Sequence, residues 1–129
     1  MSIVQPEGWN QPKGYSNGFL AAGRLLAVAG QVGWNEREEF VSDDFAAQAG
    51  QALRNVLAVV TAAGGAPQHV VRLTWYVTDK RAYRAAQREI GLAYRELFGS
   101  HYPAMTLVEV KGLLEDRAVV EIEATAVLP

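Results

Sequence analysis

The sequence predicts an α+β fold in which two amphipathic helices cover one face of a β-sheet. Two stretches carry apolar residues three and four positions apart, the spacing of a helix that packs one side against a core. Short runs of β-branched and aromatic residues, which favour strands, lie around them. The resulting order is strand, strand, helix, strand, helix, strand, strand, which is typical of the α+β class.

The first expected strands form a hairpin after an irregular arm. Residues 6–16 are rich in Pro, Gly, Asn and Trp, which favours a loop. Residues 19–22 and 25–29 are apolar and flank Gly23-Arg24, so they predict two short paired strands. Residues 30–35 are expected to be a loop.

The first helix is expected to begin at Ser42 or Asp43, because either side chain can cap a helix. Gly64-Gly65 would end it, and Pro67 prevents its continuation. Its apolar stripe consists of Phe45, Ala49, Ala52, Leu53, Val56, Leu57 and Val60.

A strand over residues 70–77 and a second helix are expected next. Thr78 and Asp79 are good caps for this helix, and Gly99 would close it. Its stripe consists of Tyr83, Ala86, Ile90, Tyr94, Leu97 and Phe98. Residues 105–110 and 118–128 are expected to be the last strands.

The expected sheet is apolar on both faces. Neighbouring residues of a strand point to opposite faces, and the pairs Leu25-Leu26, Val70-Val71 and Val119-Val120 are apolar at both positions. The helices cover only one face, so we expect a homo-oligomer to bury the other. Glu121 and Glu123 share a face, and we place them on the second one, because Val120 and Ile122 continue the helix-facing side.

The composition is that of one globular domain over residues 1–129. Of the 129 residues, 50% are hydrophobic and 20% are charged. A net charge of −2 gives no overall attraction to nucleic acids or anionic membranes. The absence of cysteine excludes disulfides, thiolate metal ligands and a cysteine nucleophile. With no long apolar run and no basic-then-apolar leader pattern, we expect a soluble cytoplasmic protein.

Several kinds of site are not supported by the sequence. His69 and His101 lack a second ligand at metal-binding spacing, so neither a metal nor another cofactor is expected. Ser16 and Ser100 lack the frame of a serine nucleophile. The arginines of the second helix alternate with glutamates, which indicates a solvated face and not a nucleic-acid surface. They are Arg81, Arg84, Arg88 and Arg95.

The remaining polar residues would suit a small polar ligand. They are the Tyr15 hydroxyl, the backbone amides around Gly30-Gln31 and the Glu121 carboxylate. Each has a simpler interpretation: Tyr15 as a packing aromatic, Gly30 as a turn residue and Glu121 as the partner of a basic side chain across an interface.

The whole ordered set of motifs resembles the Rid/YjgF family of RidA-like imine and enamine deaminases. The matching segments are Gly14-Tyr15-Ser16-Asn17-Gly18, Val28-Ala29-Gly30-Gln31, Gln48 through Asn55-Val56-Leu57, Ala63-Gly64, Val70 to Asp79, Tyr102-Pro103-Ala104-Met105-Thr106 and Val120-Glu121-Ile122-Glu123-Ala124. The resemblance implies a chorismate-mutase-like mixed sheet, a homotrimer around a central β-barrel, and ligand clefts between subunits.

The resemblance also implies roles for single residues. Glu121 matches the family's water-orienting glutamate, Tyr15 its cleft tyrosine, and Gly30 and Gln31 its backbone turn. Met105 stands where deaminating members have the arginine that grips the substrate carboxylate.

Two further positions depart from the family pattern. Gln87 stands where an asparagine is expected, and Leu114 is followed by Glu115 in place of the usual proline. Glu123 has no matched role, and we expect it to be structural.

Three functions follow from the resemblance. The first is binding of small reactive metabolites, with hydrolytic deamination of altered specificity and little activity on 2-iminopropionate. The second is non-catalytic ligand binding or regulation on the same trimer. The third, a ribonuclease or translation inhibitor, is disfavoured by the net charge and the lack of a histidine pair.

Overall fold

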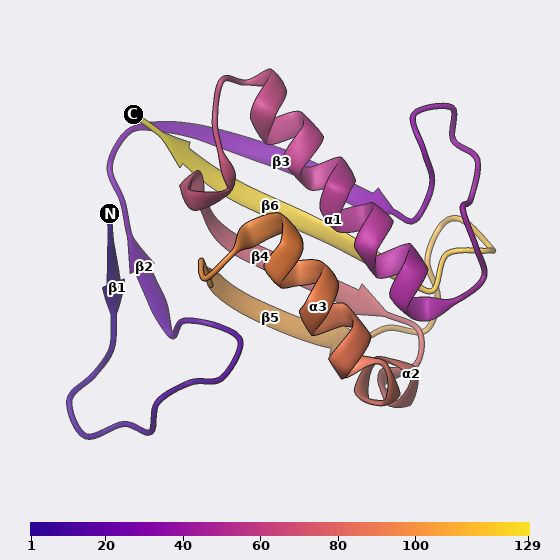
Figure 1. Ribbon diagram of the computed structural model, residues 1–129, viewed down its shortest axis with the longest axis horizontal. Coiled ribbons are helices and arrows are strands. Elements are labelled where there is room, and N and C mark those ends of the chain that lie inside the picture. The colour runs from indigo at the N-terminus through magenta and orange to yellow at the C-terminus, as the bar shows by residue number, and fades with distance from the viewer.

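A mixed four-stranded sheet forms the centre of the molecule, and helices cover one of its faces (Figure 1). The computed structural model describes residues 1–129. The elements are β1 (Ser2–Val4), β2 (Gly18–Leu20), β3 (Arg24–Val32), α1 (Phe45–Ala62), the 3-10 turn η1 (Pro67–His69), β4 (Val70–Val77), α2 (Lys80–Ala85), α3 (Gln87–Phe98), β5 (Ala104–Glu109) and β6 (Val120–Leu128). The predicted α+β class is confirmed.

The strand order of the sheet is β3-β6-β4-β5. The last strand, β6, lies antiparallel between β3 and β4, and β5 runs parallel to β4 at the edge. The parallel pair needs a long crossover, which α2 and α3 provide. The strand predicted over residues 70–77 is confirmed at both ends.

Helix α1 packs its predicted stripe against the sheet. Leu53, Val56 and Val60 are fully buried in the main core cluster. The N-cap is Asp44, whose carboxylate accepts a hydrogen bond from Ala47 N at 3.0 Å. The predicted caps, Ser42 and Asp43, lie two residues and one residue before the observed cap. Ser42 Oγ instead accepts a hydrogen bond from Asp44 N at 2.9 Å.

The predicted second helix is in fact two helices. Asp79 caps α2, and the backbone leaves helical geometry at Ala86, with φ −101° and ψ 7°, before α3 begins. Neither Gly nor Pro marks this break, so the sequence carries no signal for it. Ile90, Tyr94 and Phe98 of α3 are buried, as the stripe predicted.

The predicted hairpin is wrong. β2 pairs with β1 in a separate two-stranded sheet, and β3 pairs with β6. The chain turns between β2 and β3 at Gly23, which has φ 150° and passes so close to the Leu128 carbonyl that a Cβ would collide with it. The expected loop over residues 30–35 is also partly wrong, because β3 extends to Val32.

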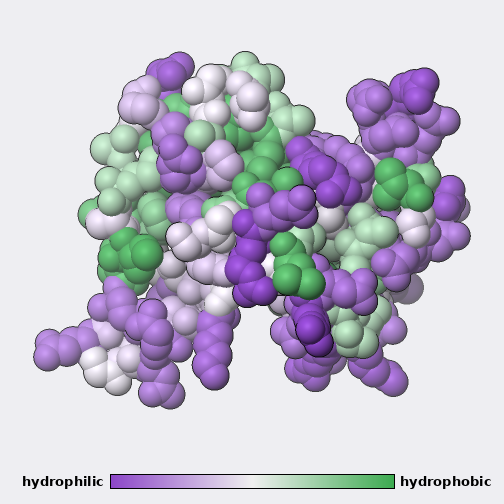
Figure 2. Space-filling model, viewed as in Figure 1, coloured by the Kyte–Doolittle hydropathy of each residue, from purple (hydrophilic) through white to green (hydrophobic).

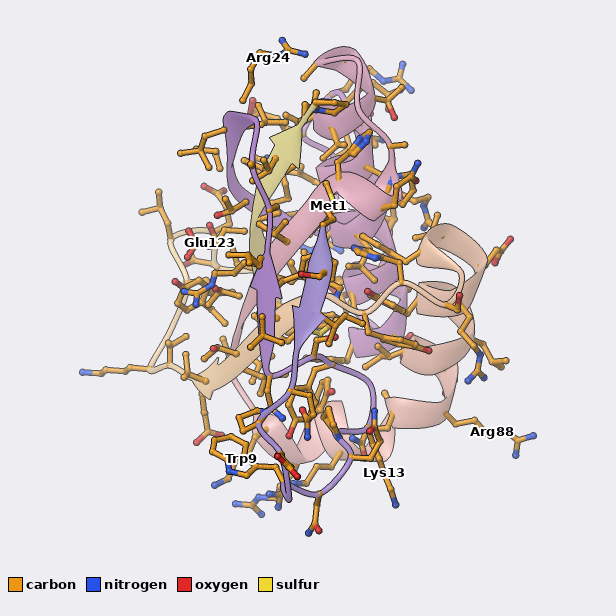
Figure 3. All side chains as sticks on the ribbon, turned by 90° about the vertical axis from the view of Figure 1, so that its left-hand side faces the viewer. Met1, Trp9, Lys13, Arg24, Arg88 and Glu123 are labelled. Carbon is orange, nitrogen blue, oxygen red and sulfur yellow. The ribbon has the colours of Figure 1, made fainter.

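The sheet face away from the helices is open in the single chain. Along β6, Val120, Ile122 and Ala124 are buried under the helices, whereas Glu121 and Glu123 point to the open face, as predicted. In Figure 3, Glu123 lies on the side of the sheet opposite the helices. On β3, the side chain of Leu25 is 74% exposed. A homo-oligomer that covers this face remains a prediction.

None of the helices has the length and apolar character that crossing a membrane would require.

Candidate functional site

A cavity of about 440 Å³ lies between the N-terminal arm, the start of β5 and the helices α2 and α3. Figure 2 shows the surface hollowed between the arm and these helices. Three of the predicted ligand-binding residues line this cavity: Tyr15 from the arm, Gln87 from α3 and Met105 from β5. Its volume is within the usual range for small-molecule sites.

One face of α3 forms a wall of the cavity. Gln87, Ile90, Gly91, Tyr94 and Arg95 all line it. These residues are spaced three, four, seven and eight positions from the first, so the helical repeat places them on the same side. The cavity therefore extends along the length of α3.

Aromatic contacts establish which end of α3 meets which part of the sheet. Tyr94 stacks on Tyr102, just before β5, with ring centroids 5.2 Å apart. Tyr83 of α2 meets Trp75 edge-on at 5.9 Å, and Trp75 pairs with Leu107 of β5. Along β5, Met105 comes between Tyr102 and Leu107, so it lies at the middle of the cavity floor.

The cavity wall holds tightly packed polar aromatics. The Tyr94 hydroxyl donates to the His101 carbonyl at 2.7 Å. Burial raises the pKa of Tyr94 above the ordinary tyrosine value, and the nearby Tyr102 adds to this shift. The indole N–H of Trp75 is buried without a hydrogen-bond partner.

The other predicted residues meet on the open face of the sheet. The β3 strand bulges between Val28 and Gln31, and this places Gly30 against the Glu121 side chain. A Cβ at position 30 would collide with the Glu121 carboxylate, so only glycine permits this approach. The Gln31 amide donates to the Ala29 carbonyl at 3.1 Å, within the same bulge.

Helix α1 holds the strand ends that carry this second group. The Asn55 side chain donates to the carbonyls of Val32 and Trp34, at 3.1 and 2.7 Å. The buried Gln48 amide oxygen accepts from Val119 N at 2.9 Å, directly before β6. The two amides thus anchor the end of β3 near Gly30 and the start of β6 near Glu121.

Glu123 has a partner within its own chain. The Tyr76 hydroxyl donates to its carboxylate at 2.6 Å. This hydrogen bond is the main reason that the pKa of Tyr76 is raised, with smaller contributions from burial and from the charges of Glu123 and Glu121. This hydrogen bond is consistent with the structural role expected for Glu123.

Within one chain, the predicted site residues thus fall into two groups. Tyr15, Gln87 and Met105 share the cavity on the helix side of the sheet. Glu121 lies with Gly30 on the opposite, open face. The folded chain holds no cluster of three histidine or acidic side chains able to hold a metal ion.

The sequence interpretation missed several residues of the cavity. Arg95 was assigned to a solvated helix face, yet it lines the cavity together with Lys13. Its spacing of eight residues from Gln87 was the available signal, since that spacing puts both on one side of a helix. From the sequence, Trp75 is expected in a strand and Tyr83 in the apolar stripe of a helix, and Tyr102 belongs to a matching segment without a role in the site.

A family model described as Endoribonuclease L-PSP matches residues 9–128. The chain belongs to this family, which is also called Rid/YjgF. One curated Rid/YjgF relative, the 2-iminobutanoate/2-iminopropanoate deaminase of Escherichia coli K12, is 36% identical over 108 residues, which cover 81% of this chain and 80% of that protein.

Solved Rid/YjgF structures share the fold. The protein YyfB from Yersinia pestis, a Rid family member of unknown function, is 34% identical with a TM-score of 0.87, covering 98% of both chains. E. coli TdcF with bound serine is 29% identical with a TM-score of 0.70, covering 100% of both chains.

Proposed function

We propose that this Rid/YjgF protein binds small imine- or enamine-like metabolites in clefts between subunits of a homotrimer. We further propose that it hydrolyses them with a specificity that differs from that of the deaminating relatives. The observation that carries the proposal is the division of the site residues into a cavity group and an open-face group.

The division supports a site built from two chains. The cavity group offers a tyrosine hydroxyl and an amide, but no acid lines the cavity. The open-face group offers the Glu121 carboxylate beside the exposed backbone of Gly30. If the open face of one copy meets the cavity edge of another, each cleft receives both groups.

The proposed chemistry needs only water and one carboxylate. Water adds to the carbon of the protonated C=N bond while Glu121 takes one proton from the water, which gives a neutral carbinolamine. Glu121 returns that proton to the nitrogen, and as the C–N bond breaks it takes the proton of the new hydroxyl group, so that ammonia and the carbonyl product are released. Tyr15 and the Gly30 amide would hold the substrate in place while this happens.

Met105 is the residue that we expect to change the specificity. A methionine offers an apolar, adaptable surface and no positive charge. A small imino acid loses the charge-assisted bidentate contact that an arginine at this position would make with its carboxylate. We therefore expect a preference for more apolar ligands and little turnover of 2-iminopropionate.

The relatives agree with this class of ligand. One is named for deaminating 2-iminobutanoate and 2-iminopropanoate, and another was solved with bound serine. The three compounds are an amino acid and two small imino acids. The finer specificity of this chain is our proposal.

The test is an imine hydrolysis assay. Imines generated in situ by an amino acid oxidase from a panel of amino acids are followed in the presence of the purified protein. We expect faster decay for apolar imines, and loss of this acceleration in Glu121→Gln. Glu96→Gln, which removes an exposed carboxylate from α3, should keep it.

The second part of the test restores a positive charge at position 105. Met105→Arg should raise kcat/KM for 2-iminopropionate by about tenfold or more, because a hydrogen bond to a charged group contributes about 1.5–3 kcal/mol. Robust turnover of 2-iminopropionate by the unaltered protein would refute the specificity proposal. If Glu121→Gln abolished ligand protection against heat without changing any turnover, a binding protein would be the better description.

A further inference from the structure

The cavity carries two positive charges on its lining. Arg95 and Lys13 line it, and no aspartate or glutamate does. Neither cation takes part in an ion pair, since the salt bridges of the chain join Arg37 to Glu39 and Arg117 to Asp43. Both cations are exposed, so they are free to bind an anion that enters from solvent.

Arg95 lies at the end of the cavity opposite Gln87. Eight residues of α3 separate them, which is about 12 Å at 1.5 Å per residue. Arg95 follows Tyr94, whose ring stacks on Tyr102 at 5.2 Å, so the charge lies at the Tyr102 end. It also lies in the last turn of α3, where the partial negative charge of the helix end favours a cation.

The part of the cavity between its two ends is apolar and aromatic. Met105 and Leu107 form the floor, and Ile90 and Tyr94 form the wall. Trp75 and Tyr83 close the far end through their edge-on contact. A volume of about 440 Å³ corresponds to roughly 15 waters at about 30 Å³ each. That space is much larger than a three-carbon imino acid needs.

We propose that Arg95 and Lys13 hold the carboxylate of imino acids that carry a large aromatic or branched aliphatic side chain. The side chain lies over Met105 and points toward Trp75 and Tyr83. The carboxylate anchor is thus moved from β5 to the C-terminal turn of α3 and the N-terminal arm. This inference rests on the proposed function, because it names the substrate class of the same site.

The arrangement separates large from small substrates. A ligand with a phenyl group gains burial along the cavity floor while its carboxylate reaches the cations. A methyl group in the same position would leave most of the apolar surface exposed to water. The alanine-derived imine is then a poor substrate because it lacks a side chain that fills the cavity.

Binding is tested by calorimetry with three stable probes. Phenylpyruvate carries both the ring and the carboxylate, phenylacetone carries the ring without the carboxylate, and pyruvate carries the carboxylate without the ring. We expect phenylpyruvate to bind about tenfold or more tightly than pyruvate, as burial of a phenyl group predicts. It should bind more tightly than phenylacetone, and added salt should reduce that difference.

Charge variants locate the anchor. Arg95→Gln and Lys13→Gln should each weaken phenylpyruvate binding by about two- to fivefold, the usual range for exposed charge pairs, and leave phenylacetone binding unchanged. The matched control is Arg88→Gln, because Arg88 is on the same helix but points away from the molecule (Figure 3). Equal binding of phenylpyruvate and phenylacetone, or equal losses in all three variants, would overturn the proposal.

Kinetics separate this inference from the proposed function. With phenylalanine-derived imine, Arg95→Gln should raise KM and leave kcat near its original value, whereas Glu121→Gln should lower kcat. If phenylpyruvate binds as expected and no imine is hydrolysed, the anion anchor stands and the deaminase proposal fails. If imines are hydrolysed but Arg95→Gln and Lys13→Gln leave KM unchanged, the anchor is wrong and the deaminase proposal stands.

Discussion

At the scale of single residues, two tyrosines are held in their protonated form by different means. The pKa of Tyr94 is raised chiefly because its hydroxyl is buried against the His101 backbone. The pKa of Tyr76 is raised chiefly because its hydroxyl donates to the Glu123 carboxylate. In both cases ionisation of the phenol would place a negative charge where the folded protein disfavours it.

The raised pKa values of these two tyrosines predict how the stability of the fold changes at alkaline pH. A pKa that is higher in the folded than in the unfolded state stabilises the fold at low pH. That stability is lost as pH rises above the ordinary tyrosine pKa of about 10 toward the folded value. In a spectrophotometric titration of the five tyrosines, we expect two, Tyr76 and Tyr94, to ionise above the ordinary tyrosine pKa. Tyr76→Phe and Tyr94→Phe should each remove one late-titrating group. Simultaneous ionisation of all five below the unfolding pH would contradict both assignments.

At the scale of secondary-structure elements, the buried Gln48 joins α1 to two other segments. Its amide nitrogen donates to the carbonyls of Ser42 and Arg117, at 2.9 and 3.0 Å. Its oxygen accepts from Val119 N at 2.9 Å. The side chain is fully buried, so these backbone groups have no access to water if the amide is removed.

Gln48→Ala should therefore be strongly destabilising. Three hydrogen bonds are lost and buried backbone groups are left without partners, so we expect a loss of about 2–4 kcal/mol in the free energy of unfolding. Chemical denaturation measures it. Gln68→Ala, at an exposed position, is the control and should change stability by less than about 0.5 kcal/mol. A loss below about 1 kcal/mol for Gln48→Ala would mean that water replaces the amide.

Element type was predictable from the sequence where local signals were strong. The β-branched and aromatic run at residues 70–77 and the apolar stripe from Phe45 to Val60 led directly to β4 and α1. The strand pairing was not predictable in the same way. β2 and β3 are adjacent in sequence, yet their partners are Ser2–Val4 and β6, which only tertiary contacts select. The break at Ala86 depends likewise on packing and not on local residue type.

At the scale of the whole molecule, the candidate site was predictable only in part for the same reason. The motifs indicated Tyr15, Met105 and Glu121 together, and the alternation of β6 correctly placed Glu121 on the open face. The alternation of side chains along one strand does not predict on which side of the sheet the N-terminal arm lies. Residues 13–15 of the arm line the cavity on the helix side, so a single chain separates residues that the motifs suggested would meet.

The open face makes this separation testable. Leu25 and Val108 are 74% and 41% exposed on it, and a second copy of the chain would remove that apolar surface from water. We expect sedimentation equilibrium to give about three times the chain mass of 14.0 kDa. Thr125 lies on the same face at the middle strand, where it pairs with Ala27 and Arg72. Thr125→Arg should give single chains, because the long side chain extends into solvent in a monomer but would have to displace the packed surface of the second copy in the assembly.

The same variant connects assembly to activity. Its far-ultraviolet circular dichroism should stay close to that of the unaltered protein. Imine turnover should fall with the loss of the assembly, because the proposed site takes Glu121 from one chain and the cavity from another. Thr61→Arg, at an exposed position on α1, should leave both mass and turnover unchanged. A monomeric Thr125→Arg protein with full turnover would show that one chain carries a complete site. The group that activates the water would then be a residue of the cavity itself and not Glu121.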